Sequence, residues 1–490
     1  MLRHTSSFRR ALRTDLTSSI VVFLVALPLC VGVAVASGVP AELGLITGIV
    51  GGLVTGLLPG SSLQVSGPAA GLTVLVLAAV REYGLPVLGL IVLAAGLLQL
   101  LLGVLRLGRW FRAISLAVVQ GMLAGIGLVL LTGQLYALAD RKAPGSGTAN
   151  LSGLPDLAGQ VLGSPRALTA LAVGAGTVAV MTLWKRLPGK AQLLPAPLVA
   201  VGGATASTVL FDLPVGRVDV SGLMAAIQPP ALADLGRLAD LGLLATVVAF
   251  TLIASAESLF SAAAVDRLHD GPRTDYDKEL MAQGAGNTVC GLLGALPMTA
   301  VIVRSAANVQ AGARTKLSRV LHGAWLLLFA ALLPDALGVI PTAALAGVLV
   351  HAGWKLLPVR EFRPLWRDHR GEAVVLAVTA GAILITNMFE GVLIGLLLAV
   401  VKTAWDISHI QIDVTDSGTG PVKVRILGNA TFLRLPRLLD TLEALPAHRP
   451  VELNLSGLRH LDHACMSALR NWADQHNAPV AQPERSPAPA

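Results

Sequence analysis

The chain has 490 residues, of which 54% are hydrophobic and only 13% are charged. A soluble domain carries about 25% charged residues, so this composition excludes an ordinary soluble protein, a disordered chain and a collagen. Three widely spaced cysteines exclude a disulfide framework and a metal-binding cysteine pair. The composition therefore predicts a polytopic α-helical membrane protein.

Apolar segments follow one another along most of the chain. A bilayer needs about 20 apolar residues per crossing helix, and twelve segments approach that length, at 15–37, 42–59, 84–104, 113–138, 166–184, 196–212, 239–264, 278–296, 317–334, 339–357, 371–387 and 389–405. Two shorter segments, 67–80 and 299–311, cannot cross alone, because a helix rises only about 1.5 Å per residue. Counting both, we expect fourteen segments.

The distribution of Lys and Arg tests this topology. If the N-terminus is cytoplasmic, 22 of these residues fall in loops on the cytoplasmic side and six in loops on the other side. This is the positive-inside bias of membrane proteins. We therefore expect a multi-pass protein of the cytoplasmic (inner) membrane with both ends in the cytoplasm, and the bias explains the net charge of +8 without a nucleic acid partner.

The two short segments occupy matching positions in the chain. GLLPGSSLQVSGPAAG begins near residue 56 and GLLGALPMTAVIVRS near residue 291, and each combines Gly-Leu-Leu, a proline, a small-residue stretch and a short helix. This spacing divides the fourteen segments into two halves of seven. Because seven is odd, the second half runs through the membrane in the opposite sense, which predicts the inverted repeat of many transporters.

A helix that begins inside the membrane exposes free N–H groups and the positive end of its dipole there. Such a helix start favours an anion. The inverted repeat aims the two predicted starts at each other. One consists of Ser66, Gly67, Pro68, Ala69 and Ala70, and the other of Met298, Thr299, Ala300 and Val301.

Very few ionisable residues lie inside the expected segments, because a charge there costs at least about 2.5–3.5 kcal/mol, and two of them are candidates for function. Arg304 follows the second helix start and can add a permanent positive charge to an anion site. Glu257 can bind a coupling ion, Na⁺ or H⁺. The alternatives are that Arg304 reaches the membrane interface, or that the two residues form a structural ion pair. No catalytic constellation, phosphate-binding loop or metal-spaced cluster stands in any segment, so we expect neither an enzyme nor a resident cofactor or metal.

The composition becomes that of a soluble domain after Asp406. Strands are predicted at HIQIDV, VKVRIL and VELNLSG, and helices at FLRLPRLLDTLEAL and HACMSALRNWADQH. We therefore expect a transmembrane domain over 1–406, a small cytoplasmic α/β domain over 407–475 and a disordered Pro/Ala-rich tail over 476–490.

Four stretches together carry a family resemblance: LVALPLCVGVAVASGVPAELGLITGIVGG, SSLQVSGPAAGLTVLV, ASAESLFSAAAVDRLHDGPRTDYDKELMAQGAGN and LPMTAVIVRSAANVQAGARTKLSRVLHG. They resemble the sulfate permease (SulP) anion transporters, the bacterial relatives of prestin and pendrin, and the terminal domain is similar to a STAS domain. The resemblance implies a core domain of segments 1–4 and 8–11, a gate domain of segments 5–7 and 12–14, elevator-type transport and a homodimer.

The resemblance also assigns residues. By position, Ser66–Ala70, Met298–Val301 and Arg304 match the anion site of the family, and Glu257 matches an acidic position linked to Na⁺ or H⁺ coupling. The chain departs from the family at Leu29 and Val33, where several relatives carry a glutamine and an aromatic residue, and at Ala300, where a glycine is common. In the segment LDHACMSAL, Asp462 is followed by His463, Ala464 and Cys465 where phosphorylated STAS proteins have a serine, so we do not expect phosphorylation at that point.

The expected function is therefore secondary active transport of a small inorganic oxyanion, bicarbonate or sulfate. Alternatives are a dicarboxylate or nucleobase transporter of the same architecture, and a passive anion channel or voltage-driven motor. Glu257 separates these classes, because a titratable group at membrane depth suits ion coupling and has no necessary role in a passive pore.

Overall fold

The computed structural model describes residues 2–113, 115–188, 194–220, 222–418, 420–446, 449–476 and 480–481. The chain forms two compact units, Met1–Leu396 and Leu397–Ala490. The division lies inside helix α19 (Met388–Ile407), ahead of the expected boundary at 406/407. The reason is local, because the end of α19 belongs to the second unit and packs within it: the Arg434 guanidinium lies 4.2 Å from the centre of the Trp405 ring, and Asn429 donates a hydrogen bond to the Ile407 carbonyl.

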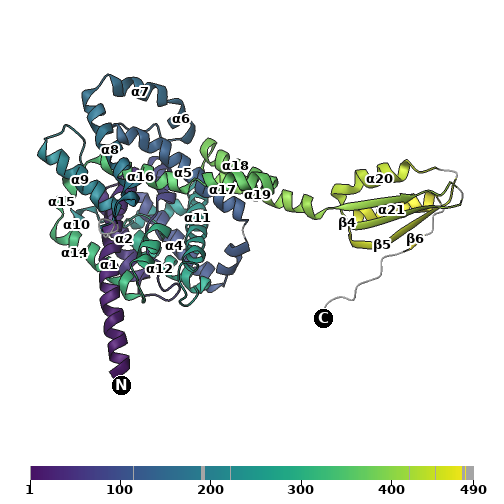
Figure 1. Ribbon diagram of the computed structural model, residues 1–490, viewed down its shortest axis with the longest axis horizontal. Helices are drawn as coiled ribbons and strands as arrows, with labels where there is room; N and C mark the ends of the chain where they lie inside the picture. Colours follow the sequence, from purple (N-terminus) through teal and green to yellow (C-terminus); the bar gives the residue numbers. More distant parts are fainter. Residues whose placement is uncertain are drawn as a thin grey trace. The chain divides into compact units, whose positions relative to one another are not determined.

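The first unit is a bundle of helices (Figure 1). Its first half contains α1 (Leu2–Ala36), α2 (Ala41–Val50) continued by the π-helical turn η1 (Gly51–Thr55), α3 (Thr73–Tyr83) preceded by η2 (Ala70–Leu72), α4 (Leu85–Val104), α5 (Leu116–Leu138), α8 (Pro165–Leu183) and α9 (Ala196–Leu210). Its second half contains α11 (Leu241–Val265), α12 (Tyr276–Leu292), α13 (Ile302–Gln310), α14 (Leu317–Leu332), α16 (Thr342–Leu356), α18 (Arg370–Ile385) and α19. Each of the fourteen expected segments coincides with one of these helices.

Shorter elements connect these helices. They are η3 (Gly108–Ala113), α6 (Gly147–Ser152), α7 (Leu154–Leu162), η4 (Trp184–Arg186), α10 (Leu223–Ala226), η6 (Leu232–Ala239), α15 (Asp335–Gly338) and α17 (Val359–Asp368). By length and composition, seven described helices are long and apolar enough to cross a membrane, and three shorter apolar helices accompany them. The α3 and α13 helices, of 11 and 9 residues, are too short to cross, as expected for interrupted segments.

The packing of the helices follows the inverted repeat. The α4 helix packs on α12, and their equivalents in the opposite halves, α14 and α2, also pack on each other. In the same way α1 packs on α14 and α11 packs on α4, while α5 packs on α18 and α16 on α8. Exchanging the two halves therefore reproduces the contacts, which confirms the predicted seven-plus-seven architecture. We call α1–α4 and α11–α14 the core group, and α5, α8, α9, α16, α18 and α19 the gate group.

One helix contact in the core group requires glycine. A Cβ atom on Gly52 would lie 2.5 Å from the Cα of Gly323, so η1 and α14 approach each other backbone to backbone. Small residues permit this distance between membrane helices. The contact fixes α14 against η1, the continuation of α2.

Two three-residue strands pair with each other, and each precedes one of the two short helices. Strand β1 (Ser66–Pro68) pairs antiparallel with β2 (Met298–Ala300), in the register Ser66↔Ala300 and Pro68↔Met298. Because β1 leads into η2 and α3 while β2 leads into α13, the two helices leave the strand pair in opposite directions. The predicted meeting of the two interrupted segments is thus realised by backbone hydrogen bonds.

Buried polar side chains hold the strand pair in place. The Met298 N–H donates to Asn287 Oδ1 at 2.7 Å, and Asn287 Nδ2 donates back to the Met298 carbonyl at 3.1 Å. On the other strand, Gln283 Nε2 donates to Ser66 Oγ at 2.7 Å. Inside a membrane protein the backbone groups of irregular segments must find partners within the protein, and α12 provides both amides.

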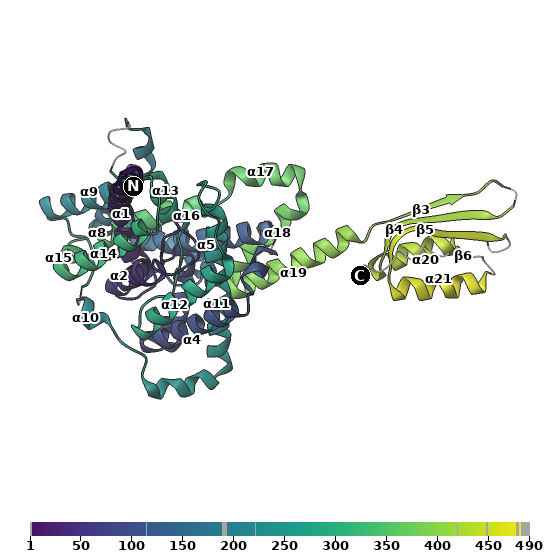
Figure 2. The same cartoon turned by 90° about the horizontal axis from the view of Figure 1, so that it is seen from below.

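The second unit contains a four-stranded sheet with strand order β3–β4–β5–β6. The β3 strand (Ile410–Thr415) is antiparallel to β4 (Val422–Ala430), whereas β5 (Val451–Leu461) and β6 (Val480–Ala481) are added in parallel. Figure 2 shows α20 (Leu435–Glu443) and α21 (His463–Gln475) on the same face of the sheet, where Leu438, Leu442, Leu469 and Trp472 enter its hydrophobic core. All three predicted strands and both predicted helices are present.

Most of the predicted disordered tail, 476–490, lies outside the described residues. Its described part includes β6, which pairs with Leu453 and Asn454 of β5. Two residues of the predicted tail thus extend the sheet, because a parallel edge of β5 is available to them.

Candidate anion-binding site

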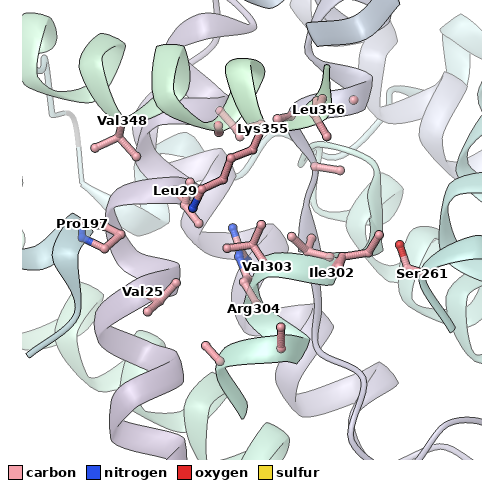
Figure 3. A pocket seen from close by; sticks show the side chains of 18 of the residues that line it. Val25, Leu29, Pro197, Ser261, Ile302, Val303, Arg304, Val348, Lys355 and Leu356 are labelled. Atoms are coloured by element: carbon pink, nitrogen blue, oxygen red, sulfur yellow. The ribbon is translucent and has the colours of Figure 1, made fainter. Parts of the chain in front are cut away.

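A cavity of about 810 Å³ lies between the core group and the gate group. Its core wall is formed by α1, η2, α11 and α13, and its gate wall by α5, α8, α9 and α16 (Figure 3). The gate residues that line it stand near the C-terminal ends of α8 and α16 and the N-terminal ends of α5 and α9, for example Met181, Leu356, Val119 and Pro197. All four helix ends lie on the side of the membrane where α1 begins, so the cavity belongs to that side.

Arg304 is the permanent charge of the core wall. Its side chain projects from the first turn of α13 and is fully buried. Its Nη2 donates to the Pro68 carbonyl at 3.4 Å, while Nε and Nη1 have no hydrogen-bond partner among the residues that the structure describes. A Cβ atom on Gly67 would lie 2.2 Å from Nη1, so only glycine at this position of β1 lets the guanidinium lie against the strand.

Glu257 is the carboxylate of the same wall. It projects from α11 and lines the cavity, and within the described part of the chain its Oε2 has no hydrogen-bond partner. A Cβ atom on Gly71 would lie 2.7 Å from Glu257 Oε1, so the carboxylate packs against the backbone that begins the first short helix. No ion pair joins Glu257 to Arg304 among the residues that the structure describes. The alternative that the two form a structural pair is therefore not what is observed.

The cavity reaches only part of the two predicted helix starts. Pro68, Ala69 and Ala70 line it from the first half, and Val301 and Arg304 from the second. The remaining predicted residues belong to the strand pair and do not line the cavity: Ser66, Gly67, Met298, Thr299 and Ala300. The N–H groups of Met298 and Ala300 already donate to Asn287 Oδ1 and Ser258 Oγ, so these two residues cannot offer them to an anion.

The start of α13 keeps the character expected of an anion site. Its N-cap residue is Val301, which cannot cap the helix with its side chain, and no side-chain cap is observed. The N–H groups of the first helical turn have no partner within a helix. Ile302 and Val303 in this turn line the cavity beside Arg304. Positive dipole and positive side chain thus meet on one surface.

The gate side of the cavity contains polar residues that the sequence did not single out. His351 and Lys355 of α16 line the wall that faces the core group, and Figure 3 shows the Lys355 side chain extending from α16 toward Leu29. Neither residue was a predicted site residue, although the expected segment 339–357 contains both. The available signal was their spacing, since residues four apart lie on one face of a helix. Gly71 was also missed, because only the fold brings it against Glu257.

The chain is similar to known proteins over most of its length. A family model described as "Sulfate permease family" matches residues 12–379. The chain is 29% identical over 405 residues to "Putative sulfate transporter YvdB" of Bacillus subtilis (strain 168), an alignment that covers 79% of this chain and 72% of the relative.

Solved structures agree with the fold. The transmembrane domain of the bicarbonate transporter BicA from a cyanobacterium matches with a TM-score of 0.65 and 25% identity, over 80% of this chain and 98% of that domain. The structure of SLC26A9 matches with a TM-score of 0.75 over 96% of this chain and 84% of its own. At 14% identity, that second likeness concerns the fold alone.

Proposed function

The chain belongs to the sulfate permease family and is a multi-pass membrane anion transporter, and we propose that it is a secondary active transporter of sulfate or bicarbonate. The observation that carries the proposal is the pair of unpartnered donors, Nε and Nη1, on the buried Arg304 guanidinium. A buried charge without a partner is costly. A small oxyanion at this place would accept hydrogen bonds from the guanidinium and from the first N–H groups of α13.

The proposed anion site is a single layer of residues on the core wall. Pro68, Ala69 and Ala70 supply a small, close backbone surface, while Val301 and Arg304 supply the dipole and the charge. Ser66, Gly67, Met298, Thr299 and Ala300 act behind this layer, since the strands that contain them fix the distance between the two helix starts.

Glu257 is the proposed site of ion coupling. A charged carboxylate in the apolar wall is costly by itself, and a nearby anion increases that cost because like charges repel. A proton or Na⁺ at Glu257 removes the repulsion. Anion and cation therefore bind cooperatively, which is the linkage that a symporter needs. We favour H⁺ over Na⁺, because Glu257 is not accompanied by a second carboxylate on the cavity wall in the described part of the chain.

Alternating access would move the core group against the gate group. The anion and coupling residues all belong to the core group, whereas the gate wall opposite them is mostly apolar, with Val119, Met122 and Val348. A core group that slides along such a wall carries its site from one side of the membrane to the other, as in elevator transport. With the N-terminus in the cytoplasm, the observed cavity is the inward-facing state.

The remaining features of the proposal follow from charge and composition. The excess of Lys and Arg on one side supports cytoplasmic ends in a cytoplasmic membrane. The C-terminal α/β domain then lies in the cytoplasm as a STAS-like module, and the active form is a homodimer.

Uptake by proteoliposomes tests the function directly. Purified protein is reconstituted, and accumulation of labelled sulfate, bicarbonate and fumarate is followed under imposed H⁺ or Na⁺ gradients. We expect gradient-driven accumulation of sulfate or bicarbonate. Fumarate accumulation alone would assign a dicarboxylate transporter, and equilibration without accumulation under both gradients would assign a passive channel.

A further inference from the structure

The α17 helix is the most strongly amphipathic segment that joins two helices of the gate group. Two residues, Leu357 and Pro358, separate it from the end of α16. A single residue, His369, separates it from α18. Both of its ends are thus tied to apolar helices of the gate group, and Figure 2 shows it at the periphery of the helical unit. A helix tied in this way remains at the surface of the membrane.

The sequence of α17, VREFRPLWRD, separates its side chains by type. Val359, Phe362 and Trp366 follow the spacing i, i+3, i+7, which places them on one helix face. Arg360, Arg363 and Arg367 follow the same spacing one residue later and form a basic face beside the apolar one. Two faces of this kind side by side are the pattern of a helix that lies in a membrane interface.

None of these side chains is buried within the protein. Val359 is 60% exposed and Trp366 is 47% exposed, and the rings of Phe362 and Trp366 stack with centroids 6.1 Å apart. Val359 and Trp366 are thus exposed, and Phe362 between them is only half-buried. Aromatic residues with a polar edge are typical of the level of lipid headgroups.

Two arginines of the basic face can bind an anionic ligand. Arg367 forms an ion pair with Asp368 at 2.8 Å. For Arg360 and Arg363, the described part of the chain contains neither an ion pair nor a side-chain hydrogen bond. We infer that α17 is a binding site for anionic phospholipids of the leaflet on the N-terminal side, with Arg360 and Arg363 on the headgroup phosphates and Val359, Phe362 and Trp366 among the upper acyl chains.

The expected consequence is a gate group anchored to the leaflet. Guanidinium groups bind phosphate with two parallel hydrogen bonds, and two of them on one face favour an anionic lipid over a zwitterionic one. The site is chemically separate from the cavity, because none of the five residues lines it. It depends on the membrane location of the chain and not on which anion is transported.

Lipid retention by the full-length protein tests the inference. The protein is purified in neutral detergent and titrated with phosphatidylglycerol or phosphatidylcholine, and native mass spectrometry counts the bound lipids. Arg360→Gln/Arg363→Gln is compared with Arg141→Gln/Lys142→Gln, which removes the same charge from an exposed loop after α5. We expect phosphatidylglycerol retention to fall roughly 5-fold per arginine in the α17 variant, with the control unchanged.

Two results would overturn the inference. An equal loss in both double variants would mean that only net charge matters, and no loss in either would mean that α17 serves another surface, such as a protein contact. Quenching of tryptophan emission by brominated phosphatidylcholine in nanodiscs gives a second readout. Brominated lipid should quench a larger fraction of the tryptophan emission in wild type than in Trp366→Phe. Equal quenched fractions in the two proteins would show that Trp366 does not lie among the acyl chains.

Discussion

The two halves of the repeat have the same elements around the strand pair but different side chains. Four residues after the end of β1 stands Leu72, which is buried in an apolar cluster, whereas four residues after the end of β2 stands Arg304. The first half presents Gly67 and Gly71 where the second half has Thr299 and Val303. Both charged residues of the core wall, Arg304 and Glu257, come from the second half and pack against those two glycines.

This difference teaches how the site divides its tasks. The symmetric backbone brings the two helix starts together, and the asymmetric side chains decide what binds there. The first half supplies glycines, against which other side chains can pack closely, and the second half supplies the charged side chains. Substitutions in the two halves should therefore impair anion binding and transport in different ways.

The largest effect is expected at the charge of the second half. Arg304→Ala should weaken anion binding roughly 100-fold or more, because loss of a charge from a buried pair costs about 3 kcal/mol or more, whereas Arg304→Lys should retain part of the affinity. Anion-dependent thermal stabilisation of purified protein measures this. An affinity that is unchanged in Arg304→Ala would remove the residue from the site and make the two halves equivalent.

The carboxylate of the second half should separate binding from coupling. Glu257→Gln imitates the protonated form and leaves the helix starts intact. We expect it to abolish accumulation driven by a gradient and to preserve exchange of labelled for unlabelled anion in proteoliposomes. If the variant still concentrates the anion, coupling lies elsewhere and Glu257 is structural.

A single methyl group tests the first half. Gly67→Ala places Cβ 2.2 Å from Arg304 Nη1 and must displace the guanidinium, so we expect anion affinity to fall about 10-fold, because a displaced guanidinium loses hydrogen bonds of about 1.5 kcal/mol to a charged partner. Gly176→Ala on α8, where nothing lies within 4 Å of the new atom, is the matched control. Equal affinities in the two variants would show that β1 does not position Arg304.

The second unit should contribute little to the folding or the anion affinity of the helical unit. Both halves of the site lie within Met1–Leu396, so deletion of residues 408–490 should leave a helical unit that inserts and binds the anion within about 2-fold of wild type, well under the 1.4 kcal/mol of a tenfold change. Detergent extraction, size-exclusion chromatography and thermal shift measure this. A truncated chain that cannot be extracted as a folded species would make the α/β domain part of the membrane fold.

The smallest effect concerns a cysteine of the second unit. Burial raises the pKa of the Cys465 thiol from 9.0 to about 12, and the neighbouring Asp462 carboxylate acts in the same direction. The thiol therefore stays protonated at pH 8 and should resist iodoacetamide while the domain is folded. Its reactivity should rise only as the pH approaches 12 or when the domain unfolds. Mass spectrometry of the labelled peptide, with Cys465→Ala as reference, follows it, and rapid labelling at pH 8 would contradict the burial.

Much of the architecture could be predicted from the sequence. Apolar runs near 20 residues gave the helices, and the matching breaks near residues 56 and 291 gave the repeat, because these are local signals with a fixed physical scale. Charge at membrane depth singled out Arg304 and Glu257, since such residues are rare and costly. The strands and helices of the second unit followed from their periodicity.

The layer of residues that meets the cavity could not be predicted in this way. Every residue before a short helix was a possible anion ligand in the sequence, but in the structure Pro68 and Val301 line the cavity whereas Ser66 and Ala300 do not. His351 and Lys355 belong to a helix far along the chain and reach the cavity only through the packing of gate against core.

The amino-acid sequence by itself thus determined which segments enter the membrane, in which order they repeat, and which two charges must be accounted for there. These properties depend on the free energy of transferring each segment from water into the lipid bilayer, which its own residues determine. Only the tertiary structure decided that Arg304 lies against Gly67 and Glu257 against Gly71, without an ion pair between them. Such contacts join residues about two hundred positions apart, and they depend on the distance between two backbones that the packing of α2, α12 and α14 sets.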